Sequence, residues 1–131
     1  MSVALTYPAE LKYVKTHEWV KVNGDGTATI GITSFAADQL GDVTYVELPK
    51  AGSKYQAEGK FGVIESVKSV SDLFMPVGGE IVSINDRLAS EPELVNNDCY
   101  GAGWMLKVKL DNQGELSTAL SADQYKEFVV D

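Results

Sequence analysis

The sequence predicts a mainly β fold, a sandwich or a barrel, with a helical C-terminus. Several short stretches rich in Val, Ile and aromatic residues are separated by turn-forming clusters, which is the pattern of sheets built from short strands. Near the C-terminus the apolar spacing changes from the two-residue period of a strand to the spacing of a helix. We expect one domain over residues 1–131, because no linker or low-complexity tract interrupts the chain.

The expected strands of the first half are separated by turns. Residues 1–12 carry no clear periodicity and are expected to form a lead-in strand or arm. Residues 17–22 contain aromatic and β-branched side chains, and residues 27–33 alternate apolar side chains on one face. The Asn-Gly-Asp-Gly cluster at 23–26 joins these stretches, so we expect them to pair as a β-hairpin. A further strand is expected over 43–48, ahead of a proline.

The second half repeats this pattern. Its expected strands cover residues 61–66, 70–75, 80–85 and 104–110. The first two flank a polar centre, Lys68–Ser69, and are therefore expected to form a second hairpin. Residues 86–103 are polar and rich in turn-forming residues, so a long connection is expected there.

Two helices are expected from their end signals. A short internal helix over 35–40 has Thr33 or Ser34 as its N-cap and Gly41 as the residue that ends it. The residues from 121 to 129 begin with a capping box, and their apolar side chains follow helical spacing.

The composition excludes several classes of function. The chain has 11 Lys and Arg residues against 19 Asp and Glu, a net charge of −8, whereas nucleic-acid binding needs clustered cations. No apolar run approaches the ~20 residues of a membrane span, and the N-terminus lacks the features of a secretory signal. Cys99 and His17 are the only cysteine and histidine, which argues against a disulfide and a zinc site. We expect a soluble, cytosolic binding or carrier protein rather than an enzyme.

One lysine stands out against this background. Lys68 lies between the two apolar arms of the second hairpin, so its amine is expected to project into water at the tip. Glu65 precedes it by three residues and Asp72 follows it by four. A solvated turn lysine is the ordinary interpretation of such a residue. The two rigid arms and the two carboxylates nevertheless give this lysine distinctive surroundings, which a modifying enzyme could recognise by shape and charge.

Lys68 is also part of a longer pattern, formed by Glu65–Ser69 together with Asp72, Pro76 and Gly79. This pattern resembles the lipoyl-attachment motif of the glycine cleavage system H protein family. The resemblance extends in order over nearly the whole chain, through Thr16–Trp19, Gly31–Thr33, Leu40–Gly41, Val46–Pro49, Pro92–Asn96 and Gly103–Trp104. So many ordered matches are far more specific than any one of them.

The resemblance implies a lipoyl-domain-like fold, the barrel-sandwich hybrid, with a short internal helix, an N-terminal strand extension and C-terminal helices. It implies that lipoate is joined by an amide to the amine of Lys68, and that no metal is bound. The attachment-motif residues around that lysine would be Glu65, Ser66, Ser69 and Asp72.

The resemblance further implies a carrier and not an enzyme. Such a carrier moves the aminomethyl group of glycine between a decarboxylase (P-protein), an aminomethyltransferase (T-protein) and a dihydrolipoyl dehydrogenase (L-protein). A lipoate ligase or a lipoyl/octanoyl transferase would attach the arm. A monomer that binds neither nucleic acid nor membrane is expected, in the bacterial cytoplasm or, in a eukaryote, the mitochondrial matrix.

In the family, the loaded arm is thought to fold back into a cleft. The matching positions here are Thr16 and Glu18, with Asp72 from the hairpin, because a protonated aminomethyl group needs carboxylate and hydroxyl acceptors. Pairing with a neighbouring lysine is the alternative for Glu18. His17 is a further candidate for the cleft, with orienting the strand or packing against Trp19 as its ordinary roles. Gln39 departs from the His of some relatives, which weakens any imidazole contact expected there.

Other interpretations of Lys68 differ in detail. Biotin carriers present their lysine between methionines, and the lipoyl domains of 2-oxoacid dehydrogenases carry Asp-Lys-Ala, whereas Lys68 lies between Val67 and Ser69. A relay that holds octanoate or lipoate for transfer to other enzymes would use the same lysine and stays open. A Schiff-base enzyme is disfavoured, since a hydrated amine at a hairpin tip has no lowered pKa.

Overall fold

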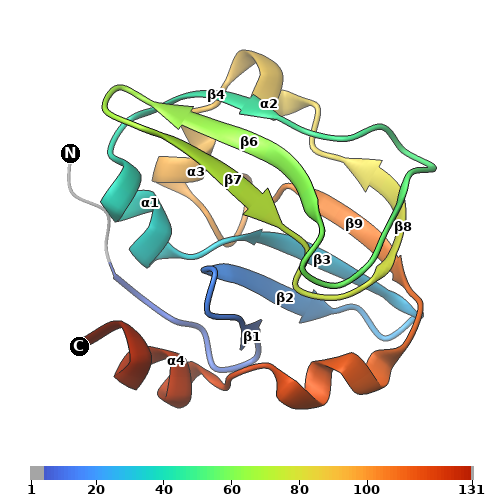
Figure 1. Ribbon diagram of the computed structural model, residues 1–131. Coiled ribbons are helices and arrows are strands. Elements are labelled where there is room, and N and C mark those ends of the chain that lie inside the picture. The colour runs from blue at the N-terminus through green and yellow to red at the C-terminus, as the bar shows by residue number, and fades with distance from the viewer. Residues whose placement is uncertain (1–4, 131) are drawn as a thin grey trace.

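The computed structural model describes residues 5–130, which form two antiparallel sheets that face each other (Figure 1). The larger sheet has the order β1-β2-β3-β9-β8-β5. Its strands are β1 (Lys12–Tyr13), β2 (Glu18–Val22), β3 (Thr27–Ile32), β9 (Leu106–Leu110), β8 (Gly79–Ile84) and β5 (Lys54–Tyr55). The smaller sheet, in the order β4-β6-β7, contains β4 (Val43–Glu47), β6 (Lys60–Ser66) and β7 (Val70–Phe74). The predicted mainly β, sandwich-like fold is confirmed.

The main core lies between the two sheets. Strand side chains alternate in direction, so each sheet turns one face of aliphatic side chains inward. The buried side chains include Val20, Ile30, Ile64, Leu73, Ile81 and Val108. Removing this apolar surface from water is the main force that holds the sheets together, at roughly 25 cal/mol per Å².

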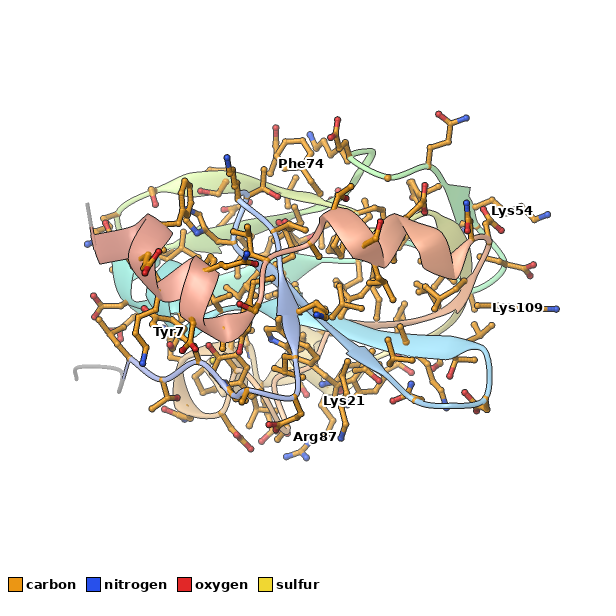
Figure 2. The ribbon with its side chains drawn as sticks, turned by 90° about the horizontal axis from the view of Figure 1, so that it is seen from below. Tyr7, Lys21, Lys54, Phe74, Arg87 and Lys109 are labelled. Carbon is orange, nitrogen blue, oxygen red and sulfur yellow. The ribbon has the colours of Figure 1, made fainter. Side chains whose placement is uncertain are left out.

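A second, aromatic cluster joins the two ends of the chain. Helix α4 (Ala122–Val130) packs on the N-terminal segment, where the rings of Tyr13 and Tyr125 stack with centroids 5.0 Å apart. Tyr7 lies beside α4 in Figure 2 and meets the Tyr125 ring edge-on at 5.3 Å. Backbone hydrogen bonds between Tyr13 and Leu120 run in both directions, at 2.9 and 2.7 Å. The C-terminal segment is thereby fixed against β1.

The two predicted helices begin where their signals place them. Helix α1 (Ser34–Leu40) has Thr33 as its N-cap, whose side-chain oxygen accepts from Ala36 N at 3.2 Å. It ends at Gly41, which has a φ of 76°. At the start of α4, Ser121 N donates to Gln124 Oε1 at 2.9 Å and Gln124 N donates to Ser121 Oγ at 3.2 Å. These reciprocal bonds are the predicted capping box.

The long connection predicted over 86–103 is wrong in part. It contains two short helices, α2 (Arg87–Ser90) and α3 (Leu94–Asn97). Each has one fully buried apolar anchor, Leu88 in α2 and Val95 in α3. Packing against the core, rather than helix propensity, therefore fixes these turns, which is why a pattern of polar residues did not predict them.

The other differences lie in short elements. The two-residue strand β5 and the 3₁₀ helix η1 (Gln113–Thr118) were not predicted. The expected lead-in strand is reduced to Lys12–Tyr13 in the described part, and residues 1–4 of that expectation lie outside it. Strand β9 begins at Leu106, two residues later than predicted. No helix among residues 5–130 is long and apolar enough to cross a membrane.

Candidate functional site

The turn between β6 and β7 presents the predicted lysine. Ser66 N donates to Ser69 O at 2.8 Å, and Ser66 Oγ accepts from the backbone N–H groups of Lys68 and Ser69 at 3.3 and 3.1 Å. Val67 N donates to Asp42 O at 3.0 Å, which ties the turn to the residue before β4. The second hairpin is thus confirmed, with an exposed Lys68 in a turn that its own backbone and Ser66 make rigid.

The stem of Lys68 leans toward α1. Gly41 ends that helix in the left-handed region, where an L side chain is disfavoured. A Cβ at Gly41 would lie 3.3 Å from Lys68 Cε, so the aliphatic stem of the lysine crosses the C-terminal end of α1. The amine lies beside the end of this helix as well, with Nζ 3.9 Å from the same Cβ position.

A cavity of about 370 Å³ lies between α1, β7 and the start of β2. Its lining residues are Thr16, His17, Glu18, Ile32, Phe35, Ala36, Gln39, Leu40, Ile64, Ser69, Ser71, Asp72 and Leu73. The cavity brings the predicted residues Thr16–Glu18 together with Asp72, from a distant part of the chain. Gln39 is also on its wall, whereas Glu65 and Ser66 of the attachment motif do not line it.

Glu18 is the buried charge of this cavity, with only 1% of its surface exposed. The Thr16 hydroxyl donates to its Oε1, and Phe74 N donates to its Oε2 at 3.2 Å. Burial raises the pKa of the Glu18 carboxyl to about 7, although both hydrogen bonds oppose the rise. Of the ion pairs among the described residues, none includes Glu18, so the alternative of a lysine partner is not found.

His17, which also lines the cavity, has an unusual backbone conformation. Its φ is 75°, in the left-handed region that few non-glycine residues adopt. The ring packs on Phe35 with centroids 4.9 Å apart, and Nδ1 lies 2.6 Å from the Tyr125 hydroxyl. Burial lowers the pKa of the imidazole, which favours a neutral ring. His17 is thus held by neighbours on two other elements.

Asp72 is the accessible acid of the cavity. It pairs with Lys60 at 3.2 Å, and both side chains are about half exposed. Such a surface ion pair contributes little to stability, so the Asp72 carboxylate can exchange partners at small cost. Asp72 lies opposite Val63 on β6, and Glu65 lies opposite Val70 at the end of the hairpin.

Cys99 and metal chemistry do not contribute to this site. Burial raises the pKa of the Cys99 thiol to about 12, so the thiolate that a nucleophile needs is scarce at neutral pH. In the described part of the chain, His, Cys, Asp and Glu side chains form no group of three or more that could hold a metal ion.

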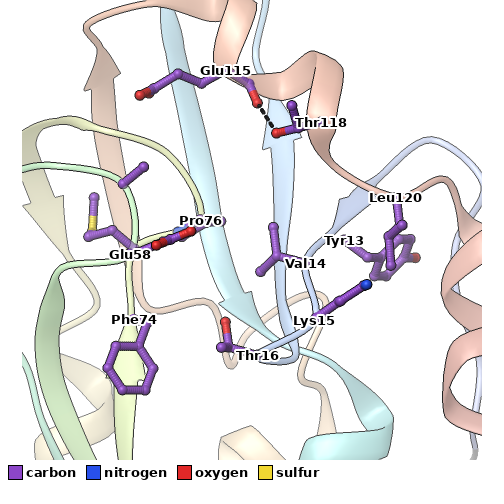
Figure 3. A pocket seen from close by; sticks show the side chains of 12 residues that line it. Tyr13, Val14, Lys15, Thr16, Glu58, Phe74, Pro76, Glu115, Thr118 and Leu120 are labelled. Atoms are coloured by element: carbon purple, nitrogen blue, oxygen red, sulfur yellow. Dashed lines mark hydrogen bonds between the residues drawn. The ribbon is translucent and has the colours of Figure 1, made fainter.

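Sequence reasoning missed a second, larger cavity of about 600 Å³ (Figure 3). It shares Thr16 with the first cavity and extends past Phe74 to η1. On its wall, Glu115 Oε1 accepts from Gly78 N at 2.8 Å. Its walls include η1 and the loop before β6, where no element was predicted, so no sequence pattern indicated a cavity there. The apolar wall that α1 gives to the first cavity was missed as well, although a spacing of four residues places Ala36 and Leu40 on one face of the helix.

Comparisons with known proteins find one family. A family model described as glycine cleavage H-protein matches residues 11–131. A glycine cleavage system H protein of Marinobacter nauticus is 54% identical over 122 residues, which cover 93% of this chain and 94% of that protein. A probable glycine cleavage system H protein of Haloarcula marismortui is 52% identical, covering 92% and 94%. The crystal structure of a glycine cleavage system H protein from Mycobacterium marinum has a TM-score of 0.87 at 35% identity, covering 94% and 98%.

The raised pKa of Glu18 predicts a specific pH dependence of folding. The folded protein binds a proton on Glu18 more tightly than the unfolded chain does. Protonation of Glu18 therefore stabilises the folded state at low pH, and this stabilisation is lost as the pH rises toward about 7. Glu18→Gln removes this ionisation. Its free energy of unfolding, relative to that of the wild type, should therefore increase by about 2–3 kcal/mol between pH 5 and pH 8.

Urea unfolding of both proteins across this pH range measures the difference. Glu47→Gln, which removes an exposed carboxyl on β4, is the matched control and should follow the wild type. Parallel pH curves for wild type and Glu18→Gln would show that Glu18 is not a buried acid with a raised pKa.

Proposed function

Because this chain belongs to the glycine cleavage H-protein family, whose members are carrier subunits rather than enzymes, we propose that it carries the aminomethyl group of glycine on a lipoyl arm attached to Lys68. The observation that carries this proposal is the cavity that runs from the hairpin of Lys68 to a buried carboxylate, Glu18. When bound, the lipoyl group supplies the sulfur to which the aminomethyl group is attached.

The position of Lys68 suits attachment of an acyl group. Its amine is exposed on a rigid turn, so an enzyme can bring an activated lipoyl or octanoyl carboxyl to it without opening the fold. Amide formation releases the activating group and one proton, and it removes the positive charge of the lysine. Val67 and Val70 flank the turn with 71% and 66% of their surface exposed, and they offer apolar contacts to such an enzyme.

The dimensions of the cavity also fit. Strand β7 spans about 13 Å from Val70 to Phe74 at ~3.3 Å per residue. A lipoyl-lysine side chain of about a dozen bonds of ~1.5 Å each reaches on the order of 15 Å when extended. Because Ser69, the residue after Lys68, already lines the cavity, an arm of this length on Lys68 can enter the cavity and extend toward the Phe74 amide, where the Glu18 carboxylate lies.

Glu18 explains how the carried group is protected. A primary amine on the carbon next to sulfur can expel the thiolate only through its free electron pair. An ammonium held by a carboxylate in a shielded cavity keeps that pair bound to a proton, and the charge-assisted hydrogen bond contributes roughly 1.5–3 kcal/mol. The hydroxyl of Thr16 keeps the carboxylate oriented, and the exposed Asp72 adds negative charge nearer the opening.

The same carboxylate argues for this role over an acyl relay. An octanoyl or lipoyl chain in transit to another enzyme carries no positive charge. In that role the carried group would offer the buried acid on the cavity wall no positive charge to offset its desolvation. Transfer of a cationic one-carbon unit is the function that uses Glu18.

The expected partners follow from the reaction. The decarboxylase loads the arm, the aminomethyltransferase unloads it, the dihydrolipoyl dehydrogenase reoxidises it, and a ligase or transferase first attaches it. A tethered arm makes each of these encounters intramolecular once the proteins have docked, which raises the effective concentration of the carried group.

We predict that Lys68 is the one acceptor of lipoate. With a lipoate ligase, ATP and lipoate, the wild-type protein should gain a single lipoyl mass, and peptide mapping should place it on Lys68. Lys68→Arg keeps the charge but should gain no mass, because a guanidinium is not acylated. Lys54→Arg is the matched control and should gain mass normally. A lipoyl group on Lys54 or Lys60, or modification of Lys68→Arg, would remove the basis of the assignment.

We predict that Glu18 slows loss of the carried group. At pH 8, aminomethyl-loaded Glu18→Gln should release formaldehyde and ammonia about tenfold faster than wild type in the absence of the aminomethyltransferase, the effect of about 1.4 kcal/mol. Lipoylation of Lys68 should be unaffected, and Glu47→Gln should decay at the wild-type rate. Equal decay of the Glu18→Gln and wild-type proteins would mean that the carboxylate does not hold the group.

We predict that partner docking is steered by charge. With a net charge of −8, the protein should bind a basic surface of the decarboxylase, and its apparent affinity should weaken severalfold as the Debye length falls from about 30 Å at 0.01 M salt to about 8 Å at 0.15 M. Saturation kinetics at several salt concentrations measure this. An affinity that is constant or rises with salt contradicts an electrostatic interface.

A further inference from the structure

The hydroxyl of Tyr125 contacts a residue that lines the cavity, although no residue of α4 lines the cavity itself. The Tyr125 side chain is fully buried, and its oxygen lies 2.6 Å from His17 Nδ1 and 2.8 Å from Thr33 Oγ1. His17, in the turn before β2, lines the cavity. Thr33 does not line it but is the N-cap of α1, and residues of that helix form another wall. One buried hydroxyl therefore connects the C-terminal helix to both walls.

The partners are consistent with one order of the hydrogen bonds, in which Thr33 donates to Tyr125 and Tyr125 donates to His17. Thr33 Oγ1 already accepts from Ala36 N, so its own proton is free to be donated to the Tyr125 oxygen. The Tyr125 hydroxyl can then donate to His17 Nδ1. This order requires a neutral imidazole that carries its proton on Nε2, in agreement with the burial of the ring.

The left-handed backbone of His17 makes this bond important for the cavity. A non-glycine residue at a φ of 75° persists only where its surroundings hold it. Thr16 and Glu18 are its two neighbours in the chain. A change in the backbone at His17 would therefore turn the Thr16 hydroxyl and the Glu18 carboxylate relative to the cavity.

We infer that Tyr125 is a positioning residue for the cavity: through its hydroxyl it holds His17 and Thr33, and with them the Thr16–Glu18 segment and the start of α1. This inference rests on the proposed function, since it concerns protection of the same carried group. It assigns to the C-terminal helix a role in the site that is separate from its apolar packing.

Two conservative variants separate the hydroxyl from the packing. Tyr125→Phe keeps the ring that stacks on Tyr13 and removes only the two hydrogen bonds. Tyr13→Phe is the matched control, because it removes a buried hydroxyl from the same cluster, one that donates to Pro8 O at 2.6 Å and touches neither wall of the cavity. Both variants should fold, since both keep the aromatic contacts.

The readouts are the tautomer of His17 and the decay of the aminomethyl-loaded protein. His17 is the only histidine, so the ¹⁵N NMR shifts of its imidazole are unambiguous. In the wild type the proton should reside on Nε2. In Tyr125→Phe the tautomers should mix, and the loaded protein should decay about fivefold faster. Tyr13→Phe should change neither.

The outcomes distinguish this inference from the proposed function. If Glu18→Gln accelerates decay and Tyr125→Phe does not, the role of Tyr125 is overturned alone. If neither variant accelerates decay, the protective role proposed for Glu18 falls as well, whereas the carrier function itself is tested by lipoylation of Lys68. An equal acceleration by Tyr13→Phe would assign the effect to the aromatic cluster as a whole and would also overturn the inference.

A rescue experiment tests the same link from the side of His17. Asn tolerates a positive φ and offers an oxygen that can accept from the Tyr125 hydroxyl, whereas Val does neither. His17→Asn should therefore keep the decay of the loaded protein near the wild-type rate, and His17→Val should accelerate it. Equal rates in the two variants would contradict the positioning role.

Discussion

The arrangement of the site depends on one buried carboxylate. Glu18 accepts a hydrogen bond from the Thr16 hydroxyl at one oxygen and from the Phe74 amide at the other, and so it joins the start of β2 to the end of β7. These strands belong to different sheets, so the same contact fixes the cavity between them. Ionisation of a carboxyl group in this buried position costs desolvation energy unless a cation lies against it. This cost raises the pKa of Glu18 to about 7. We propose that the cavity takes up a positive group that the protein itself does not supply.

The rest of the fold places a lysine in the turn of the hairpin whose strand β7 lines this cavity. The β6–β7 hairpin holds Lys68 in a turn closed by Ser66 and Ser69, and Gly41 leaves space for the lysine stem beside α1. Through the hydroxyl of Tyr125, the aromatic cluster under α4 contacts His17 on the cavity wall and Thr33 at the N-cap of α1. In the proposed function, the rigid turn, the cavity and the buried acid together hold the end of a tethered arm.

Local patterns predicted much of the fold, and tertiary contacts account for what they missed. The hairpin turns, the Thr33 cap and the Ser121–Gln124 capping box are signals that a few neighbouring residues carry, and the structure has all of them. Helices α2 and α3 were missed because single buried anchors, not periodicity, hold them. The motif singled out Lys68 as the proposed attachment site, and the structure has this lysine exposed in the turn of the second hairpin. The burial of Glu18 could not be predicted, because β2 buries three consecutive residues and so departs from strict alternation. The contact between His17 and Tyr125 joins residues 108 apart, and only the docked helix reveals it.

The central claim is that the Glu18 carboxylate faces the positive charge of the carried group. The most direct test is the pKa of that carboxyl, measured by ¹³C NMR in lipoylated protein before and after aminomethyl loading, with Glu18→Gln used to assign the signal. In the unloaded protein the pKa should be about 7. Loading brings an ammonium within contact, so the pKa should fall to below about 6. A pKa that stays the same after loading would contradict the account, because it would place the carried charge away from Glu18.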